Sequence, residues 1–374
     1  NSTSGWSGRG GQCLNPYQLD RSPSGSSGGS GIAAAASLAA GTLGTETNGS
    51  ILSPSGVNGI VGVKPTVGLT SRTGCIPIAA SQDTIGPMCR TVADAALLLA
   101  AVAGPDPSDS ATLGAPRERW DLDAILDPNG LKGARIGVAR KVYWGYQLQT
   151  DAVAESALDA LRDAGAEVID PADLPSADEI AGGWPPPPAN DQLNVLLYEF
   201  KAGINAYLAT RGERSQVKTL ADLIAFNAAH RDEEMPWFGQ DLFEQAEEKG
   251  PLTDQSYRDS LARNLRLSRD EGIDAALKTY QLDALVMPTT GPAWKIDLVN
   301  GGGSKGGSST PAALAGYPAI TVPMGMVHGL PVGLTFMGTA WSEPLLLKLA
   351  FAFEQATMAR RPPTYARAGV LPPG

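Results

Sequence analysis

The sequence has very little of two residue types on which many hydrolases and metalloproteins depend. Its 374 residues include only two histidines and three cysteines. His230 ends an amphipathic helical segment and His328 lies in a turn between two predicted strands, so we interpret both as exposed structural residues. We therefore expect no Ser-His-Asp triad, no histidine-rich site and no bound metal.

The cysteines are Cys13, Cys75 and Cys89, too few and too scattered for a disulfide framework or a zinc site. Each is predicted to be a free, buried thiol. No apolar run reaches the roughly 20 residues of a membrane span. The net charge of −10 argues against nucleic acid or an anionic membrane as an obligate partner, and no cofactor is expected.

Lysine is missing from residues 1–63, although that stretch is rich in serine and glycine. A phosphate-binding P-loop ends in Gly-Lys-Ser/Thr, so this type of loop is not expected there. What is present is a pair of serine-bearing, glycine-rich loops at 24–30 and 45–50, within residues 21–66. Hydrophobic residues make up 43% of the chain, which is typical of a globular protein.

The segment between the two loops is small and apolar. We predict a buried helix over 32–40, because alanine favours helix, and a short strand over 42–45. A serine hydroxyl needs a base to become a nucleophile, and glycines let backbone N–H groups crowd a reacting oxygen. The first loop alone fits a flexible linker equally well. The second loop, reached through an apolar segment, favours a site that holds two hydroxyls together.

The order and spacing of three motifs resemble the amidase signature hydrolases. The motifs are Gly-Ser-Ser-Gly-Gly-Ser at 25–30, Gly-Thr-Glu-Thr-Asn-Gly-Ser-Ile at 44–51 and Gly-Val-Lys-Pro-Thr at 62–66. Asn-Pro-Tyr at 15–17 and Leu-Asp-Arg-Ser at 19–22 add a likeness to bacterial peptide amidases. The resemblance implies an α/β fold with a large twisted mixed β-sheet flanked by helices on both faces. It implies one N-terminally incomplete domain over 1–374, with 21–66 as its signature core and 184–282 as a variable helical region on the substrate side.

A Ser-cisSer-Lys mechanism is also implied by the resemblance. Ser50 is then the nucleophile, and Ser26 is a bridging serine held by a cis peptide bond after Gly25. The implied oxyanion hole consists of the backbone N–H groups of Thr47, Asn48, Gly49 and Ser50. Ser27 and Glu46 occupy positions whose side chains brace the loops in the family.

The sequence departs from the family pattern in two places. The family's catalytic lysine lies upstream of the bridging serine, where this sequence has none, and Lys64 matches a structural lysine. The stretch that begins at Asn1 looks like the middle of a longer protein. We therefore expect a missing N-terminal segment or another chain to supply that lysine. Leu52 stands where many members have arginine, which favours the peptide amidase branch.

The rest of the chain alternates predicted helices and strands. Thr91 is predicted to cap a helix over 92–103 that buries Leu97, Leu98, Leu99 and Val102. A strand at 135–139, a helix at 151–164 and a strand at 166–170 predict a parallel βαβ unit. Further predicted helices are 192–211, 220–231, 253–280 and 343–359, and further strands are 283–288, 318–325 and 330–338. We interpret 184–188 as a surface insertion, and 301–309 equally as a linker or as a loop at the mouth of the site.

The resemblance implies an amidase that acts on a small-molecule or peptide amide. The favoured reaction is hydrolysis of linear amides, above all C-terminal peptide amides, with release of ammonia. The alternative is a non-catalytic module or a complex-dependent amidotransferase-like subunit, because the chain lacks the lysine. The cellular compartment stays open, with the cytoplasm favoured.

Overall fold

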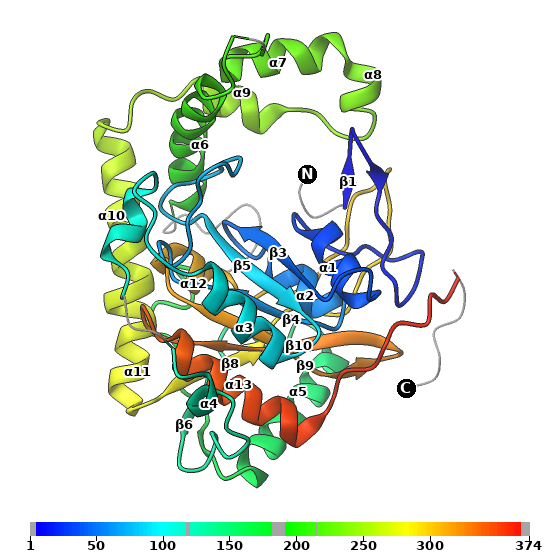
Figure 1. Ribbon diagram of the computed structural model, residues 1–374, viewed down its shortest axis with the longest axis vertical. Helices are drawn as coiled ribbons and strands as arrows, with labels where there is room; N and C mark the ends of the chain where they lie inside the picture. The colour runs from blue at the N-terminus through cyan, green and yellow to red at the C-terminus, as the bar shows by residue number, and fades with distance from the viewer. Residues whose placement is uncertain (1–4, 117–119, 182–190, 214, 368–374) are drawn as a thin grey trace.

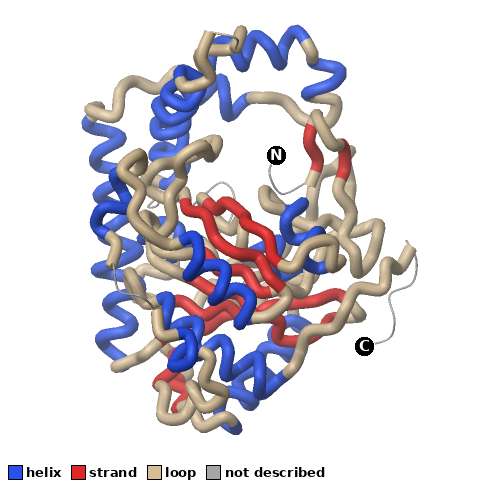
Figure 2. Tube along the Cα trace, viewed as in Figure 1, coloured by secondary structure: helices blue, strands red, loops and turns tan. Residues whose placement is uncertain are grey.

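An eight-stranded mixed β-sheet forms the centre of the computed structural model, which describes residues 5–116, 120–181, 191–213 and 215–367 (Figures 1 and 2). The strand order is β3-β5-β4-β9-β10-β8-β6-β7. Neighbours from β3 to β8 pair antiparallel, whereas β8, β6 and β7 pair parallel. The strands are β3 (Gly41–Glu46), β4 (Val61–Lys64), β5 (Thr84–Cys89), β6 (Arg135–Val138), β7 (Glu167–Ile169), β8 (Ala284–Pro288), β9 (Ala319–Val327) and β10 (Leu330–Met337), and a separate hairpin pairs β1 (Trp6–Ser7) with β2 (Gly11–Gln12).

The central strands are buried along most of their length because both faces of the sheet are covered. Along β8, Val286 packs into one core, whereas Leu285 and Met287 pack into the other. Successive side chains of a strand point to opposite faces, so a continuous apolar run supplies both cores.

Helices cover each face of this sheet. Helices α3, α5 and α13 pack on one face, and α2, α11 and α12 line the core on the other, while α6–α9 extend beyond the sheet (Figure 1). The α-helices are α1 (Gly28–Ala35), α2 (Leu52–Val57), α3 (Val92–Val102), α4 (Leu122–Ile125), α5 (Leu148–Asp163), α6 (Gln192–Ala209), α7 (Leu220–Ala229), α8 (Arg231–Glu234), α9 (Asp241–Glu247), α10 (Gln255–Ser268), α11 (Asp274–Tyr280), α12 (Thr310–Ala315) and α13 (Glu343–Thr357). In addition, η1 (Ser110–Gly114) is a 3₁₀-helix and η2 (Arg269–Ile273) is a π-helical turn.

The fold class predicted from the sequence is confirmed by this mixed, doubly covered sheet. The β6–α5–β7 unit is parallel, and β9 and β10 form a hairpin whose turn contains His328. Thr91 caps α3 by accepting a hydrogen bond from the Asp94 amide at 3.1 Å. The predicted insertion at Trp184–Pro188 falls outside the described residues. Among the helices of the described ranges, none combines the length and apolar character that crossing a bilayer requires.

The helix predicted over 32–40 is wrong in its bounds, because α1 begins at Gly28 and ends at Ala35. It ends early because Ser37 adopts a positive φ of 60° and the Arg90 side chain binds the carbonyls of Ala34 and Ala39. Only one face of the helix is buried. Alanine propensity therefore indicated the helix but not its ends.

Two other helix predictions need correction. Leu97 is 54% exposed, and the buried face of α3 consists of Val92, Ala95, Ala96 and Leu99. The single helix predicted over 253–280 is interrupted by the η2 turn, where Gly272 leaves helical geometry. Apolar composition alone did not reveal which side of α3 faces the sheet.

The chain after α13 runs back beside the residues that precede the first serine loop. The Leu19 amide donates to the Ala366 carbonyl at 2.8 Å, and the Tyr365 amide donates to the Pro16 carbonyl at 2.9 Å. The Tyr17 hydroxyl bonds the carbonyl of Arg361. The segment after α13 therefore holds residues 16–19, which lead into residues 21–66, in place.

Lys64 ends β4 in the middle of the protein and is fully buried. Its Nζ donates to the carbonyls of Tyr317 at 2.7 Å and Pro65 at 3.3 Å. Burial lowers the pKa of Lys64 to about 8, against the opposing effect of the Glu46 and Glu343 carboxylates. The lysine thus supplies the positive charge between two buried acids.

We predict that Lys64→Met lowers the free energy of unfolding by about 3–5 kcal/mol near neutral pH, because two buried carboxylates lose their cation. Burial already raises the pKa of Glu46 and of Glu343. Without Lys64 they would be held as neutral acids, so the loss should shrink as the pH falls. Urea unfolding at about pH 5 and about pH 7.5 measures both effects. The control is Lys278→Met at an exposed position, and an equal loss in the two variants would contradict the prediction.

Candidate active site

The two serine loops meet at the end of β3, where the chain turns into α2. The Ser27 amide donates to the Ser50 carbonyl at 3.2 Å. The Ser24 and Ser53 hydroxyls share a hydrogen bond of 2.8 Å, which ties the first loop to α2. Ser26 is exposed, whereas Ser50 is 7% exposed. The peptide bond between Gly25 and Ser26 is cis, as the resemblance implies.

The first loop also closes the outer edge of the sheet. The Ser27 hydroxyl donates to the Thr45 carbonyl at 3.0 Å and accepts from the Thr45 amide at 3.1 Å. The Ser30 hydroxyl donates to the Leu43 carbonyl at 2.8 Å. A Cβ on Gly44 would lie 2.9 Å from the Ser27 hydroxyl, so glycine permits this close approach. Ser27 therefore fixes the first loop to β3.

Glu46 is the last residue of β3 and is buried beneath the second serine turn, which we define as residues 46–50. Its Oε2 accepts hydrogen bonds from the amides of Ile51 at 2.7 Å and Leu52 at 2.9 Å. Burial raises the pKa of Glu46, while Lys64 and the amides of Leu52, Ile51 and Gly49 lower it. The carboxylate thus holds the backbone directly after Ser50.

Thr47 is held by the segment that precedes β5. Its hydroxyl donates to Asp83 Oδ1 at 2.5 Å, and its carbonyl accepts from Gln82 Nε2 at 3.1 Å. Asp83 Oδ2 accepts the amides of Ile78 at 2.8 Å and Ala79 at 2.9 Å. Burial raises the pKa of Asp83, and the Thr47 hydroxyl and these amides oppose the rise.

The Asn48 side chain connects the turn to elements far along the sequence. Its amide nitrogen donates to Gln192 Oε1 at 3.1 Å and to Thr310 Oγ1 at 3.2 Å. Its amide oxygen accepts from the Ser309 hydroxyl at 2.6 Å. Gly49 adopts a φ of +84°, and a Cβ there would lie 2.9 Å from the Ser309 hydroxyl. Glycine is required at this position for both backbone and steric reasons.

Several residues around the turn were missed from the sequence. Residues 301–309 form a loop that reaches the turn through Ser309, which supports a loop at the site over a linker. Gln192 and Thr310 carry no local signal, because they approach Asn48 only through the tertiary fold. Asp83 was not missed, because it lies in the turn-rich stretch 80–88, for which the sequence leaves open a plain loop and a role in supporting the site. Its bonds to the Thr47 hydroxyl and to the Ile78 and Ala79 amides favour the supporting role.

The histidines and cysteines do not contribute to the residues gathered at the turn. His230 is exposed, as predicted, and its ring stacks on Phe226. His328 lies half-buried in the β9–β10 turn, so the prediction that it is exposed is wrong. All three cysteines are free, but only Cys89 is fully buried. Within the described ranges, no cluster of three or more His, Cys, Asp or Glu side chains is arranged to hold a metal ion.

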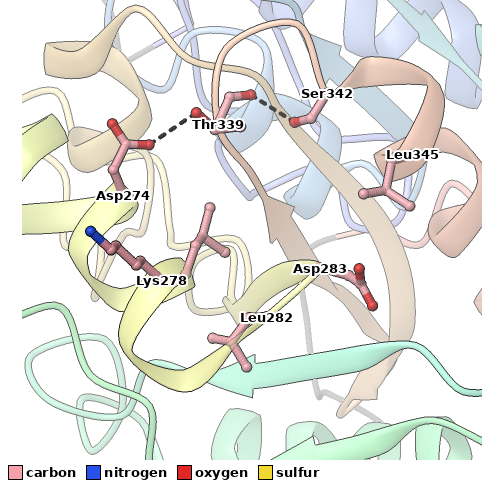
Figure 3. Close-up of a pocket in the computed structure, with 8 residues that line it drawn as sticks. Asp274, Lys278, Leu282, Asp283, Thr339, Ser342 and Leu345 are labelled. Atoms are coloured by element: carbon pink, nitrogen blue, oxygen red, sulfur yellow. Dashed lines mark hydrogen bonds between the residues drawn. The ribbon is translucent and has the colours of Figure 1, made fainter.

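A surface hollow of about 400 Å³ lies between α11 and the start of α13 (Figure 3). Asp274 accepts a hydrogen bond from the Thr339 hydroxyl at 2.9 Å, and Ser342 donates to the Thr339 carbonyl at 2.7 Å. The hollow contains none of the residues of the serine loops. The hollow therefore lies apart from the two serine loops.

Known proteins resemble this chain in sequence and in fold. Residues 2–347 match the family described as Amidase. A probable amidase of Arabidopsis thaliana is 41% identical over 96% of this chain and 65% of its own length. A glutamyl-tRNA(Gln) amidotransferase subunit of Synechococcus sp. is 35% identical over 93% of this chain and 67% of its own length.

The solved structure of native peptide amidase from Stenotrophomonas maltophilia is 51% identical, with a TM-score of 0.90, over 98% of this chain and 72% of that protein. The chain spans 65%, 61% and 64% of three amidases from Arabidopsis thaliana, Arthroderma benhamiae and Schizosaccharomyces pombe. With a family match over nearly the whole chain and the two serine loops joined at the sheet edge, the chain belongs to the amidase signature family.

Proposed function

We propose that the protein hydrolyses linear amides, and C-terminal peptide amides in particular, with release of ammonia. The observation that carries the proposal is the hydrogen bond from the Ser27 amide to the Ser50 carbonyl, which joins the two serine loops. The likeness to peptide amidase supports the choice of substrate.

In this proposal Ser50 attacks the amide carbonyl and Ser26 passes the proton of Ser50 to a base. The developing oxyanion is stabilised by backbone N–H groups among Thr47, Asn48, Gly49 and Ser50. As the tetrahedral intermediate collapses, the relay returns a proton to the departing ammonia, and water then releases the acyl group from Ser50.

We propose that the base is a lysine outside residues 1–374. Lys64 is not suited to the role, because its Nζ is buried and donates to the carbonyls of Tyr317 and Pro65. Burial does lower the pKa of Lys64 to about 8, as a base near neutral pH requires, but these two bonds engage its Nζ with carbonyls of residues outside the serine loops.

We predict that Ser50→Ala in the full-length protein lowers ammonia release from a C-terminal peptide amide by about 10⁴-fold or more, because the nucleophile is lost. A coupled ammonia assay measures this loss, and a fluorophosphonate probe should label the parent protein at Ser50 but not the variant. Ser156→Ala on the exposed face of α5 is the control. Unchanged turnover in Ser50→Ala would refute the assignment.

We predict that Glu46→Gln lowers kcat about 10-fold or more and changes KM by less than about 3-fold, because the carboxylate positions Ser50 without touching substrate. The substitution removes the charge that faces Lys64 and weakens the bonds to the Ile51 and Leu52 amides. Steady-state kinetics measures the effect against Glu248→Gln, an exposed control. A rise in KM with kcat unchanged would instead assign Glu46 to substrate binding.

A complex-dependent amidotransferase-like subunit is the second candidate. The 35% identity to the glutamyl-tRNA(Gln) amidotransferase subunit of Synechococcus sp. favours it. The purified full-length protein separates the two candidates. Ammonia release from a peptide amide by this protein alone supports the hydrolase, whereas release that needs an added partner chain supports the amidotransferase-like role.

A further inference from the structure

We propose that Gln82 and Asp83 are positioning residues that set the direction of the Asn48 backbone N–H. The inference deepens the proposed function and rests on it, because that N–H is one of the proposed oxyanion donors. Neither residue needs to contact the substrate for this role.

Gln82 and Asp83 each form a hydrogen bond with a different group of Thr47. Gln82 Nε2 donates to the Thr47 carbonyl at 3.1 Å, and Asp83 Oδ1 accepts from the Thr47 hydroxyl at 2.5 Å. Gln82 is 2% exposed. A buried donor that loses its acceptor is costly, so the Thr47 carbonyl is held in one direction.

The geometry of the peptide unit passes this constraint to Asn48. The Thr47–Asn48 peptide is trans, so its carbonyl and its N–H point in opposite directions within one plane. Because the carbonyl points to Gln82, the Asn48 N–H points away from Gln82. The Asn48 side chain is held independently by Gln192, Ser309 and Thr310. The Thr47–Asn48 peptide plane is therefore constrained on its Thr47 side and on its Asn48 side.

The segment that contains Gln82 and Asp83 is itself anchored to helices α6 and α10. The Ser81 amide and hydroxyl both donate to Glu199 Oε2, at 2.8 and 2.9 Å. Tyr257 donates to Glu199 Oε1 at 2.7 Å. Glu199 lies on α6 and Tyr257 on α10, so two helices hold the segment that sets the peptide plane.

A residue that only orients an oxyanion donor should affect the transition state and leave substrate binding nearly unchanged. Removing a donor outright typically lowers kcat about 10²–10³-fold, so releasing its orientation should cost less. The structure therefore assigns Gln82 an effect on kcat, with little effect on KM.

The test is Gln82→Met in the full-length protein, since methionine keeps the size and removes the donor. We expect kcat for a C-terminal peptide amide to fall about 10–100-fold and KM to change by less than about 3-fold. Inhibition by a peptide aldehyde, whose adduct with Ser50 places an oxygen at the same point, should weaken by the same factor as kcat. Gln149→Met, at an exposed position, is the matched control.

Thr47 gives a second pair of variants for the Asp83 contact. Thr47→Ser keeps the hydroxyl and should retain kcat within about 3-fold, whereas Thr47→Val keeps the shape, loses the hydroxyl and should lower kcat about 10-fold or more. Equal kcat in the two variants would overturn the role of Asp83. Parent-like kcat per titrated active site in Gln82→Met, with only stability reduced, would overturn the role of Gln82.

Failure of the proposed function is recognised separately, since the unsubstituted full-length protein would then release no ammonia. In that case amide hydrogen exchange of a peptide covering 45–50 still tests the grip on Thr47. Faster exchange in Gln82→Met than in Gln149→Met supports it, and equal exchange in the two variants overturns it.

Discussion

The site depends on one buried carboxylate. Glu46 accepts the amides of Ile51 and Leu52, which follow Ser50 directly, so its position decides where α2 begins. An isolated buried charge is strongly unfavourable. Lys64 on β4 offsets that cost, and Glu343 at the start of α13 shares the lysine. The charges buried in the core therefore help to fix the geometry of the turn that carries Ser50.

Close backbone approach is the second constraint. The first loop lies against β3 because Gly44 leaves room for the Ser27 hydroxyl, and the loop from 301 to 309 reaches the turn because Gly49 leaves room for Ser309. Hydroxyl and amide groups then bond the loops to strand carbonyls and to each other. Small residues at these points let the loops approach the strand and each other closely.

Sequence patterns predicted what is encoded locally. The serine motifs, the Thr91 cap and the β6–α5–β7 unit depend on residues close in the chain, and each could be located before the structure was known. The end of α1 could not, because it is set by Arg90 binding the carbonyls of Ala34 and Ala39 from the end of β5. The partners of Asn48 could not be predicted for the same reason, since Gln192 and Thr310 reach it only in the folded protein.

The tail that follows α13 has a consequence for biosynthesis. Tyr17 bonds Arg361, a residue 344 positions later. At translation rates of about 5–20 residues per second, Arg361 is synthesised roughly 17–70 s after Tyr17. Strands β9 and β10, at the centre of the sheet, also emerge late. One edge of β6 and one edge of β4 therefore stay unpaired until β8 and β9 have been made, a period in which chaperones would have reason to bind the chain.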